Sequence, residues 1–93
     1  MITRHDVVAR LTDYLHHRIS LEELVGWAED AMMEEEFDEH DLEVLRGIVG
    51  RIGLANVKEF GLAWEDCEAF LLHLGYCVQI QVTEARQEGE KGL

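Results

Sequence analysis

Serine and histidine are the residue types in this chain most often used in catalysis, and neither occurs in a catalytic arrangement. Ser20 is the single serine, and no histidine or acid is placed in the sequence to activate it as a nucleophile. Hydrogen bonding at a helix start is the favoured role for its hydroxyl. The glycines are scattered singly and form no phosphate-binding loop. We therefore predict no catalytic residue and no enzyme activity.

A metal site is the second chemistry that the sequence could support. His16 and His17 follow Asp13 by about one helical turn, which could bring imidazole and carboxylate groups to one face of a helix. The chain lacks the His-x-x-x-His pair and the paired-cysteine spacing of zinc sites. Cys67 and His73 would lie on different faces of one helix. Since histidines are also favoured at the negative end of a helix dipole, we predict no metal and no other cofactor.

Carboxylates are the most abundant chemical groups on the chain. There are 20 acidic against 8 basic residues, the formal net charge is −12, and 11 of the acids lie between Arg18 and Arg46, where no lysine or arginine occurs. An EF-hand calcium loop needs a glycine at its sixth position, and the acidic stretch 34–43 contains Phe37 and no glycine. Two interpretations stay open. The acids form either a solvated face that only keeps the protein soluble, or a surface for a positively charged partner.

A basic protein is the partner that this charge favours. Binding to nucleic acid depends on cations that replace counterions along the phosphates, so direct nucleic-acid binding is disfavoured. An acidic surface speeds encounter with a basic protein, as would suit an inhibitor of a nuclease. Trp27, Met33, Phe37 and Trp64 are candidate anchors, with burial in the core as the alternative for each. The predicted partner-binding residues are Glu29, Asp30, Met33, Glu34, Glu35, Glu36, Phe37, Asp38, Glu39 and Asp41.

Three segments share a pattern typical of helix starts: an apolar residue, a capping side chain, two residues, an acid and a second apolar residue. They are 2–7, 19–24 and 37–42. The capping side chain can accept a hydrogen bond from an amide of the first turn, and the acid can reach back to the cap backbone. The cap and acid pairs are Thr3 with Asp6, Ser20 with Glu23, and Asp38 with Asp41. We therefore expect three helices that begin at these positions.

Apolar residues at helical spacing follow each start, and a fourth such stripe runs from about Trp64 to Leu74 with Gly75 as its cap. Gly53 also suits a left-handed cap position. Gly47 and Gly50, one turn apart, are expected to permit a close helix crossing, with a weak, frayed helix as the alternative. Residues 54–62 fit either a short turn capped by an asparagine or a short strand, and the turn is favoured.

Alternation of apolar and polar residues from Tyr76 to Val82 predicts a half-buried strand. A lone strand leaves its backbone groups unpaired, so it must pair with 57–62, with a symmetry mate or with the sheet edge of a partner. Residues 83–93 have no apolar pattern and are expected to form a flexible tail. The predicted organisation is a single helical domain over 1–82 followed by this tail.

The expected cellular location follows from three features that the sequence lacks: a long apolar run, a signal core and a set of paired cysteines. No apolar run approaches the roughly 18 residues that cross a bilayer, so no membrane contact is predicted. The first residues open directly into an amphipathic pattern without an apolar signal core, which predicts a cytoplasmic location. Cys67 and Cys77 are too few for a secreted disulfide framework and are expected to be reduced.

The region from Tyr14 to Met33 resembles small acidic bacterial immunity proteins that neutralise tRNase toxins of the colicin D kind. The resemblance rests on a helix end, a basic residue, Ile19-Ser20, Glu23-Leu24 and a second amphipathic helix with Trp27-Ala28. It covers about a fifth of the chain and implies a helical bundle whose acidic face occupies the basic cleft of a toxin. The C-terminal half is more similar to uncharacterised small bacterial proteins.

These observations predict a mainly α fold, a compact bundle of four main helices with a short C-terminal β-strand. The predicted function is that of a non-catalytic, acidic interaction protein of the immunity or antitoxin kind that inhibits a basic protein. The alternative is a structural or assembly domain that forms a homodimer through its C-terminal strand.

Overall fold

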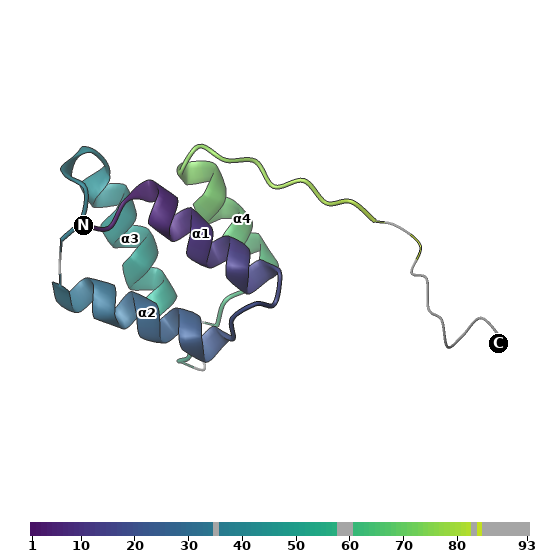
Figure 1. Cartoon of the computed structure of the whole chain (residues 1–93), viewed down its shortest axis with the longest axis horizontal. Coiled ribbons are helices and arrows are strands. Elements are labelled where there is room, and N and C mark those ends of the chain that lie inside the picture. Colours follow the sequence, from purple (N-terminus) through teal and green to yellow (C-terminus); the bar gives the residue numbers. More distant parts are fainter. Residues whose placement is uncertain (35, 58–60, 83, 85–93) are drawn as a thin grey trace.

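Four helices make up the body of the protein, as predicted (Figure 1). The computed structural model describes residues 1–34, 36–57, 61–82 and 84, and the side chain of Glu34 is not described. The predicted tail therefore lies outside the described residues except for Glu84. The helices are α1 (Arg4–Leu15), α2 (Leu21–Glu34), α3 (Leu42–Gly53) and α4 (Trp64–His73), with a 3-10 turn η1 (Glu39–Asp41) before α3.

The first two helix starts are formed by the predicted capping boxes. At α1, the Asp6 amide donates to Thr3 Oγ1 at 3.3 Å, and the Thr3 amide donates to the Asp6 carboxylate at 2.9 Å. At α2, the Glu23 amide donates to Ser20 Oγ at 3.0 Å, and the Ser20 amide donates to Glu23 Oε1 at 2.8 Å. Two of the amides that each helix start leaves unpaired are satisfied in this way. Ser20 is thus used as a cap.

The third helix start differs from the prediction. Asp38 does act as a cap, but its carboxylate accepts from the His40 amide at 3.1 Å and starts the 3-10 turn η1 rather than α3. Asp41 does not reach back to Asp38, because its carboxylate pairs with Arg4 and the Asp38 amide donates to the carbonyl of Ile2. Contacts of Asp38 and Asp41 with the N-terminal segment have replaced the predicted capping box between them.

The chain leaves α1 through a left-handed residue. His17 has φ of 63°, its amide donates to the Tyr14 carbonyl at 3.0 Å, and the Arg18 amide donates to the Asp13 carbonyl at 2.8 Å. This is the Schellman arrangement, in which glycine is usual at the left-handed position. Histidine there carries a strained backbone conformation.

Gly75 takes the predicted left-handed position after α4. Its φ is 92°, its amide donates to the Leu72 carbonyl at 3.0 Å, and the Tyr76 amide donates to the Leu71 carbonyl at 2.8 Å. At the other end of α4 half of a capping box forms, because alanine has no acceptor in its side chain. The Ala63 amide donates to Asp66 Oδ2 at 2.8 Å.

One apolar core unites the four helices. Each helix contributes the face that its stripe predicted, and α2 and α3 share the most extensive interface. A helix with one apolar face gains most of its stability from packing that face away from water. The fully buried large side chains are Val7 and Leu11 of α1, Leu24 of α2, Leu45, Val49 and Ile52 of α3, Cys67 of α4, and Leu74, which follows α4.

The glycines of α3 only partly serve the predicted crossing. A Cβ placed on Gly50 would lie 3.8 Å from Met32 Cε, and one on Gly53 would lie 3.9 Å from Ala28 Cβ, so both face α2. Gly47 has no atom within 4 Å of such a Cβ, and its predicted role in the crossing was wrong. Gly53 was also predicted to be a left-handed cap, but its φ is not positive and it ends α3 as a helical residue.

The ambiguous segment after α3 is a turn where the structure describes it. The amides of Ala55 and Val57 donate to the carbonyls of Ile52 and Leu54 at 2.9 and 3.0 Å. The turn itself is therefore confirmed for 54–57, whereas its capping by Asn56 stays a prediction and 58–60 lie outside the described residues.

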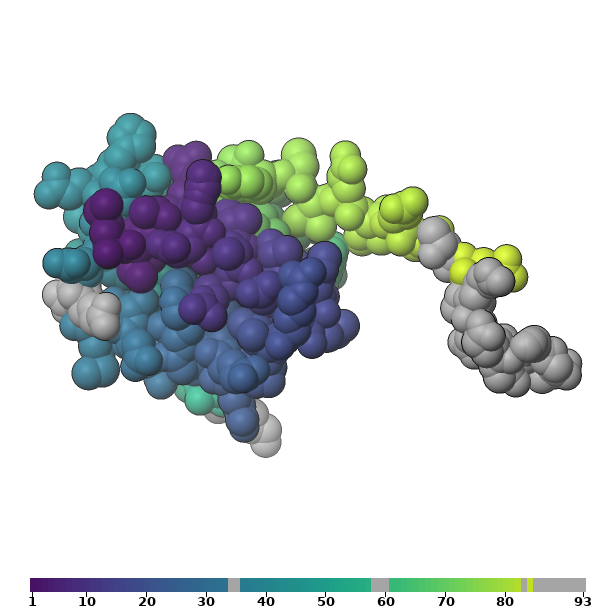
Figure 2. Space-filling model, viewed as in Figure 1, coloured from purple at the N-terminus to yellow at the C-terminus, as the bar shows by residue number. Residues whose placement is uncertain are grey.

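The predicted C-terminal strand is not formed. Residues 76–82, here called the C-terminal arm, belong to no ladder, and Ile2–Phe37 is the one isolated bridge among the described residues. The arm leaves the end of α4 as an extended chain and stands clear of the body over its outer half (Figures 1 and 2). Alternation favours an extended backbone, but a strand also needs a neighbour to pair with. In the part of the chain that is described, no helix has both the length and the apolar character to cross a membrane.

Candidate partner-binding surface

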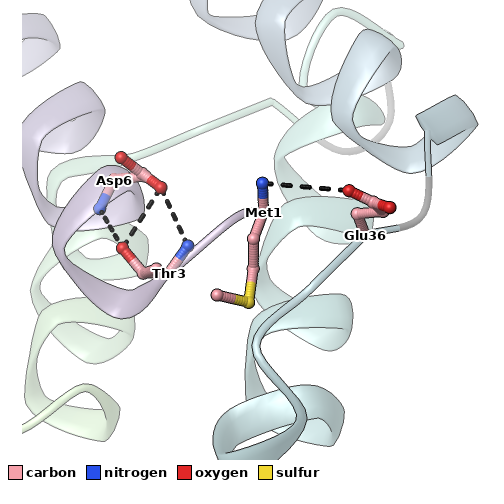
Figure 3. A network of polar contacts seen from close by, with 4 residues as sticks. All are labelled: Met1, Thr3, Asp6 and Glu36. Atoms are coloured by element: carbon pink, nitrogen blue, oxygen red, sulfur yellow. Dashed lines mark hydrogen bonds and ion pairs between the residues drawn. The ribbon is translucent and has the colours of Figure 1, made fainter.

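The N-terminal residues hold the acidic segment after α2 in place. Ile2 and Phe37 form a parallel bridge, in which the Ile2 amide donates to the Glu36 carbonyl at 2.6 Å and the Asp38 amide donates to the Ile2 carbonyl at 2.8 Å. The amino group of Met1 lies 3.9 Å from Glu36 Oε1, next to the capping box of α1 (Figure 3). Backbone pairing on both sides of Phe37 gives this part of the loop a defined path.

The side chain of Phe37 attaches that loop to the hydrophobic core. Its side chain is only 6% exposed and belongs to the main core cluster, against which Ile2 also packs. The predicted partner-binding set included Phe37, but its ring faces the protein's own interior. Burying an aromatic ring removes a large apolar area from water and ties the loop to the helices.

Asp41 is likewise occupied within the protein. Its Oδ1 accepts a hydrogen bond from Arg4 Nη2 at 2.9 Å, and its side chain is 15% exposed. The hydrogen bond from Arg4 lowers the pKa of Asp41 below its ordinary value of 3.8, with a further contribution from the positive charge of Arg4. This ion pair joins the start of α1 to the end of η1.

The remaining described members of the predicted set belong to elements on one side of the body, the end of α2 and the loop before α3 (Figure 1). We call this set the acidic corner. Its side chains come from the last turns of α2, the bridged loop and η1, and all are exposed except that of Asp38, which is intermediate. Met33, at 79% exposure, is the apolar residue among them. The acidic corner consists of Glu29, Asp30, Met33, Glu36, Asp38 and Glu39.

Few cations neutralise the acid-rich span. Among the described residues, the ion pairs that involve it are Arg4 with Asp41 and the Met1 amino group with Glu36. Three other described cations have partners outside the acidic corner: Arg18 pairs with Asp13 at 3.0 Å, Arg51 lies 3.6 Å from Asp66, and the guanidinium of Arg10 lies over the ring of Trp27. Glu29, Asp30 and Glu39 have no ion pair in the described structure. The corner therefore carries a negative potential that faces solvent.

The sequence predicts that the basic residues of the first helix, Arg4 among them, lean on the acidic region, but sequence reasoning did not assign a partner to Arg4 and did not find Ile2 and the Met1 amino group as parts of this region. All three act on residues more than 30 positions away in the sequence. The periodicity of residues 2–7 indicated only a helix start. The isolated charge of Arg4 next to a cap was the available signal, and it does not specify which of many acids it meets.

The two tryptophans lie outside the acidic corner. Trp27 is partly buried against the core, with the Arg10 guanidinium carbon 5.6 Å from its ring centroid, a cation–π distance. Trp64, at 39% exposure, lies at the start of α4. It lines an apolar groove of about 470 Å³ together with Leu15 of α1, Leu71 of α4 and the C-terminal arm.

Metal-binding groups do not gather in the described residues, where no group of three His, Cys, Asp or Glu side chains could hold an ion. Asp13 pairs with Arg18, so its carboxylate is not shared with His16 and His17. Both thiols are unpaired, as expected for reduced cysteines. Burial raises the pKa of the Cys67 thiol to about 11, whereas Cys77 is exposed on the arm.

Comparisons with protein-family models, with curated proteins and with solved structures found no match to this chain.

Proposed function

We propose that this protein is a non-catalytic interaction protein that binds a basic protein through the acidic corner. The observation that supports this most strongly is the pairing of Ile2 with Phe37, which fixes the path of the loop that joins the acids of α2 to those of η1. A loop that served only solubility would not require such an anchor. The helix pattern that resembles tRNase immunity proteins agrees with the role of an inhibitor.

The proposed surface combines charge with one apolar contact. Exposed carboxylates raise the rate of encounter with a cationic partner and set its orientation, but they add little affinity by themselves. Met33 projects from the last turn of α2 with 79% of its surface exposed, and methionine adapts well to the shape of a partner. We expect carboxylates to guide the basic protein and Met33 to supply the central contact.

The repulsion of phosphates also follows from this surface. An acidic face held against the basic cleft of a nuclease would occupy the positions of the phosphates and exclude the nucleic acid. A protein that blocks such a cleft needs no catalytic group. A nuclease or another nucleic-acid-binding protein is thus the class of partner that we propose.

The test begins with affinity capture from the native host at low and moderate salt, with identification of the recovered proteins. A basic protein should be recovered at low salt, and its purified form should bind with an affinity that falls as salt rises. Recovery of no basic protein, or binding that is indifferent to salt, would contradict the proposal.

Two triple variants with equal charge separate a specific surface from general acidity. The first, Glu29→Gln, Asp30→Asn and Glu39→Gln, neutralises the acidic corner. The second, Glu65→Gln, Glu68→Gln and Glu84→Gln, removes two acids of α4 and one that lies beyond the arm. Each changes the net charge from −12 to −9.

We expect the corner variant to lose at least about tenfold in affinity for the recovered protein, equivalent to about 1.4 kcal/mol, and the second variant to lose much less. Met33→Ala should lower affinity with little change in salt dependence, because it removes a contact without a charge. Equal losses in the two triple variants would show that the acids serve only as a general negative field.

A further inference from the structure

The C-terminal arm belongs to the longest uncharged stretch of this strongly acidic chain. Residues 69–83 contain no Asp, Glu, Lys or Arg. The walls of the groove beside the arm likewise contain no Asp, Glu, Lys or Arg, since they consist of Val8, Thr12, Leu15, His16, Trp64 and Leu71. The groove therefore offers apolar contacts and no Asp, Glu, Lys or Arg to an occupant, in contrast to the acidic corner.

The inner and outer halves of the arm differ in how they are covered. Val78 packs against the core and is partly buried, whereas Ile80 and Val82 are 67% and 88% exposed. Beyond the Tyr76 amide, which caps α4, no hydrogen bond involves the backbone of the arm within the described residues. The arm thus presents unpaired backbone groups, and the apolar side chains of Ile80 and Val82 are not covered by the rest of the chain.

We infer that two copies of this chain pair through their arms as an antiparallel two-stranded ribbon centred on Gln79. A two-fold axis at Gln79 places Val78 opposite Ile80 and Tyr76 opposite Val82 of the second copy. All four apolar positions of each arm then lie on one face of the ribbon, because residues two apart share a face. Shifting the axis to Val78 pairs Val82 with Leu74, the buried residue that follows α4, and shifting it to Ile80 pairs Tyr76 with Glu84.

This register also fills the groove. The outer half of one arm lies beside the inner half of the other, so Ile80 and Val82 of the second copy come to lie over the groove next to Trp64. A two-stranded ribbon is only marginally stable alone in water and needs an apolar surface to pack against. The walls contributed by α1 and α4 supply that surface in both copies.

A second copy also fits the distribution of charge. In Figure 1 the end of α2 and the loop before α3 lie on one side of the body, and the arm projects from the other. Pairing through the arms keeps the two acidic corners apart, where salt screens their repulsion over a Debye length of about 8 Å at physiological ionic strength. The contact itself joins neutral surfaces.

The oligomeric state of the full chain is the first test, by sedimentation equilibrium at low and at physiological salt. We expect a monomer–dimer equilibrium in which added salt favours the dimer. Ile80→Glu should raise the dissociation constant at least about tenfold, because it places a carboxylate in the apolar groove. Leu72→Glu is the matched control: Leu72 is 55% exposed on α4 and does not line the groove, so the dimer should persist.

Disulfide trapping tests the register. In a Cys77→Ser background, Gln79→Cys places two thiols directly across the two-fold axis, where opposed Cα atoms are about 4.5–5.5 Å apart, within the range of a disulfide. Gln81→Cys in the same background faces the same way, but its two thiols would lie roughly 14 Å apart. Mild oxidation should cross-link the first variant rapidly and the second slowly. Buried Cys67 does not compete.

A full chain that stays monomeric at every concentration and salt would overturn this inference. Equal cross-linking at positions 79 and 81 would overturn the register, and arm-dependent capture of a different protein without self-association would assign the arm to a hetero-partner instead. These results are independent of the acidic corner. Its triple variant should dimerise at least as well as the natural chain, while Ile80→Glu should leave binding to a basic protein intact.

Discussion

The acidic corner and the C-terminal arm both face solvent, but they differ in how the rest of the chain supports them. The corner is fixed by long-range contacts: the Ile2–Phe37 bridge, the buried ring of Phe37 and the ion pair of Arg4 with Asp41. The arm is held at one end by Val78 and the cap of Gly75, whereas Ile80 and Val82 in its outer half are largely exposed. A rigid charged surface suits recognition of a partner already folded, whereas an unpaired edge gains its structure on association.

Phe37→Ala and Ile80→Ala give the largest expected difference between the two regions. Losing the buried ring should lower the free energy of unfolding by about 3–5 kcal/mol, because a cavity replaces lost apolar contacts. The same truncation at Ile80, measured in dilute monomer, should change it by less than about 0.5 kcal/mol. Urea unfolding followed by circular dichroism measures both. Similar losses at the two positions would remove the contrast between them.

Asp41→Asn probes the ion pair that closes the corner. Since the folded-state pKa of Asp41 lies below its ordinary value, the carboxylate stabilises the fold at neutral pH, and this stabilisation is lost as pH falls through the lowered pKa. The variant should have a lower melting temperature than the natural chain at pH 7 and approach it below about pH 3. Glu29→Gln removes an acid that has no ion pair, so this variant should have the same melting temperature as the natural chain at pH 7 and below about pH 3. A constant difference for Asp41→Asn across pH would contradict the assignment.

Gly47→Ala, on the side of α3 that faces solvent, should increase the stability of the protein. No atom lies within 4 Å of an added Cβ there, so the substitution gains helix propensity worth about 1 kcal/mol without a clash. Gly50→Ala, whose added Cβ would touch Met32, is the comparison on the buried side. Thermal unfolding of both variants measures the gain. A destabilised Gly47→Ala would mean that another molecule or segment approaches this glycine.

His17→Gly should give the smallest gain. A left-handed backbone costs an ordinary residue about 1–2 kcal/mol, and glycine offsets part of this through its greater entropy in the unfolded chain. We expect a net increase in stability of less than about 1 kcal/mol, measured by urea unfolding. His17→Ala, which keeps the strain, is the control. Equal stabilities of the two variants would indicate that strain at this position is relieved in some other way.

Local signals carried most of what the sequence predicted. Capping at Thr3 and Ser20, the apolar faces of the helices and the cap at Gly75 involve residues within a few positions of one another, so spacing alone specifies them. The Asp38 and Asp41 pair had the same spacing, but Arg4 and Ile2 took over its hydrogen-bonding groups. No local rule ranks a distant partner against a near one.

In the candidate surface, too, local features could be predicted from the sequence and features that depend on distant contacts could not. Exposure of Glu29, Asp30 and Met33 agreed with their positions on the outer face of α2, whereas the burial of Phe37 depended on a core assembled from all four helices. The alternation of the arm indicated an extended backbone correctly. Pairing could not follow from one sequence, because it requires a second strand.

Because Cys67 is buried, the rate at which its thiol reacts can measure how often α4 separates from the other helices. Its thiol is shielded by the bundle and, with a pKa near 11, is almost entirely protonated at neutral pH, so a soluble alkylating reagent can reach it only after this helix lifts away. The rate of its alkylation, relative to that of exposed Cys77 in the same molecule, therefore reports how often the interior opens under native conditions. A ligand that clamps the helices together would slow the first reaction and leave the second as an internal standard.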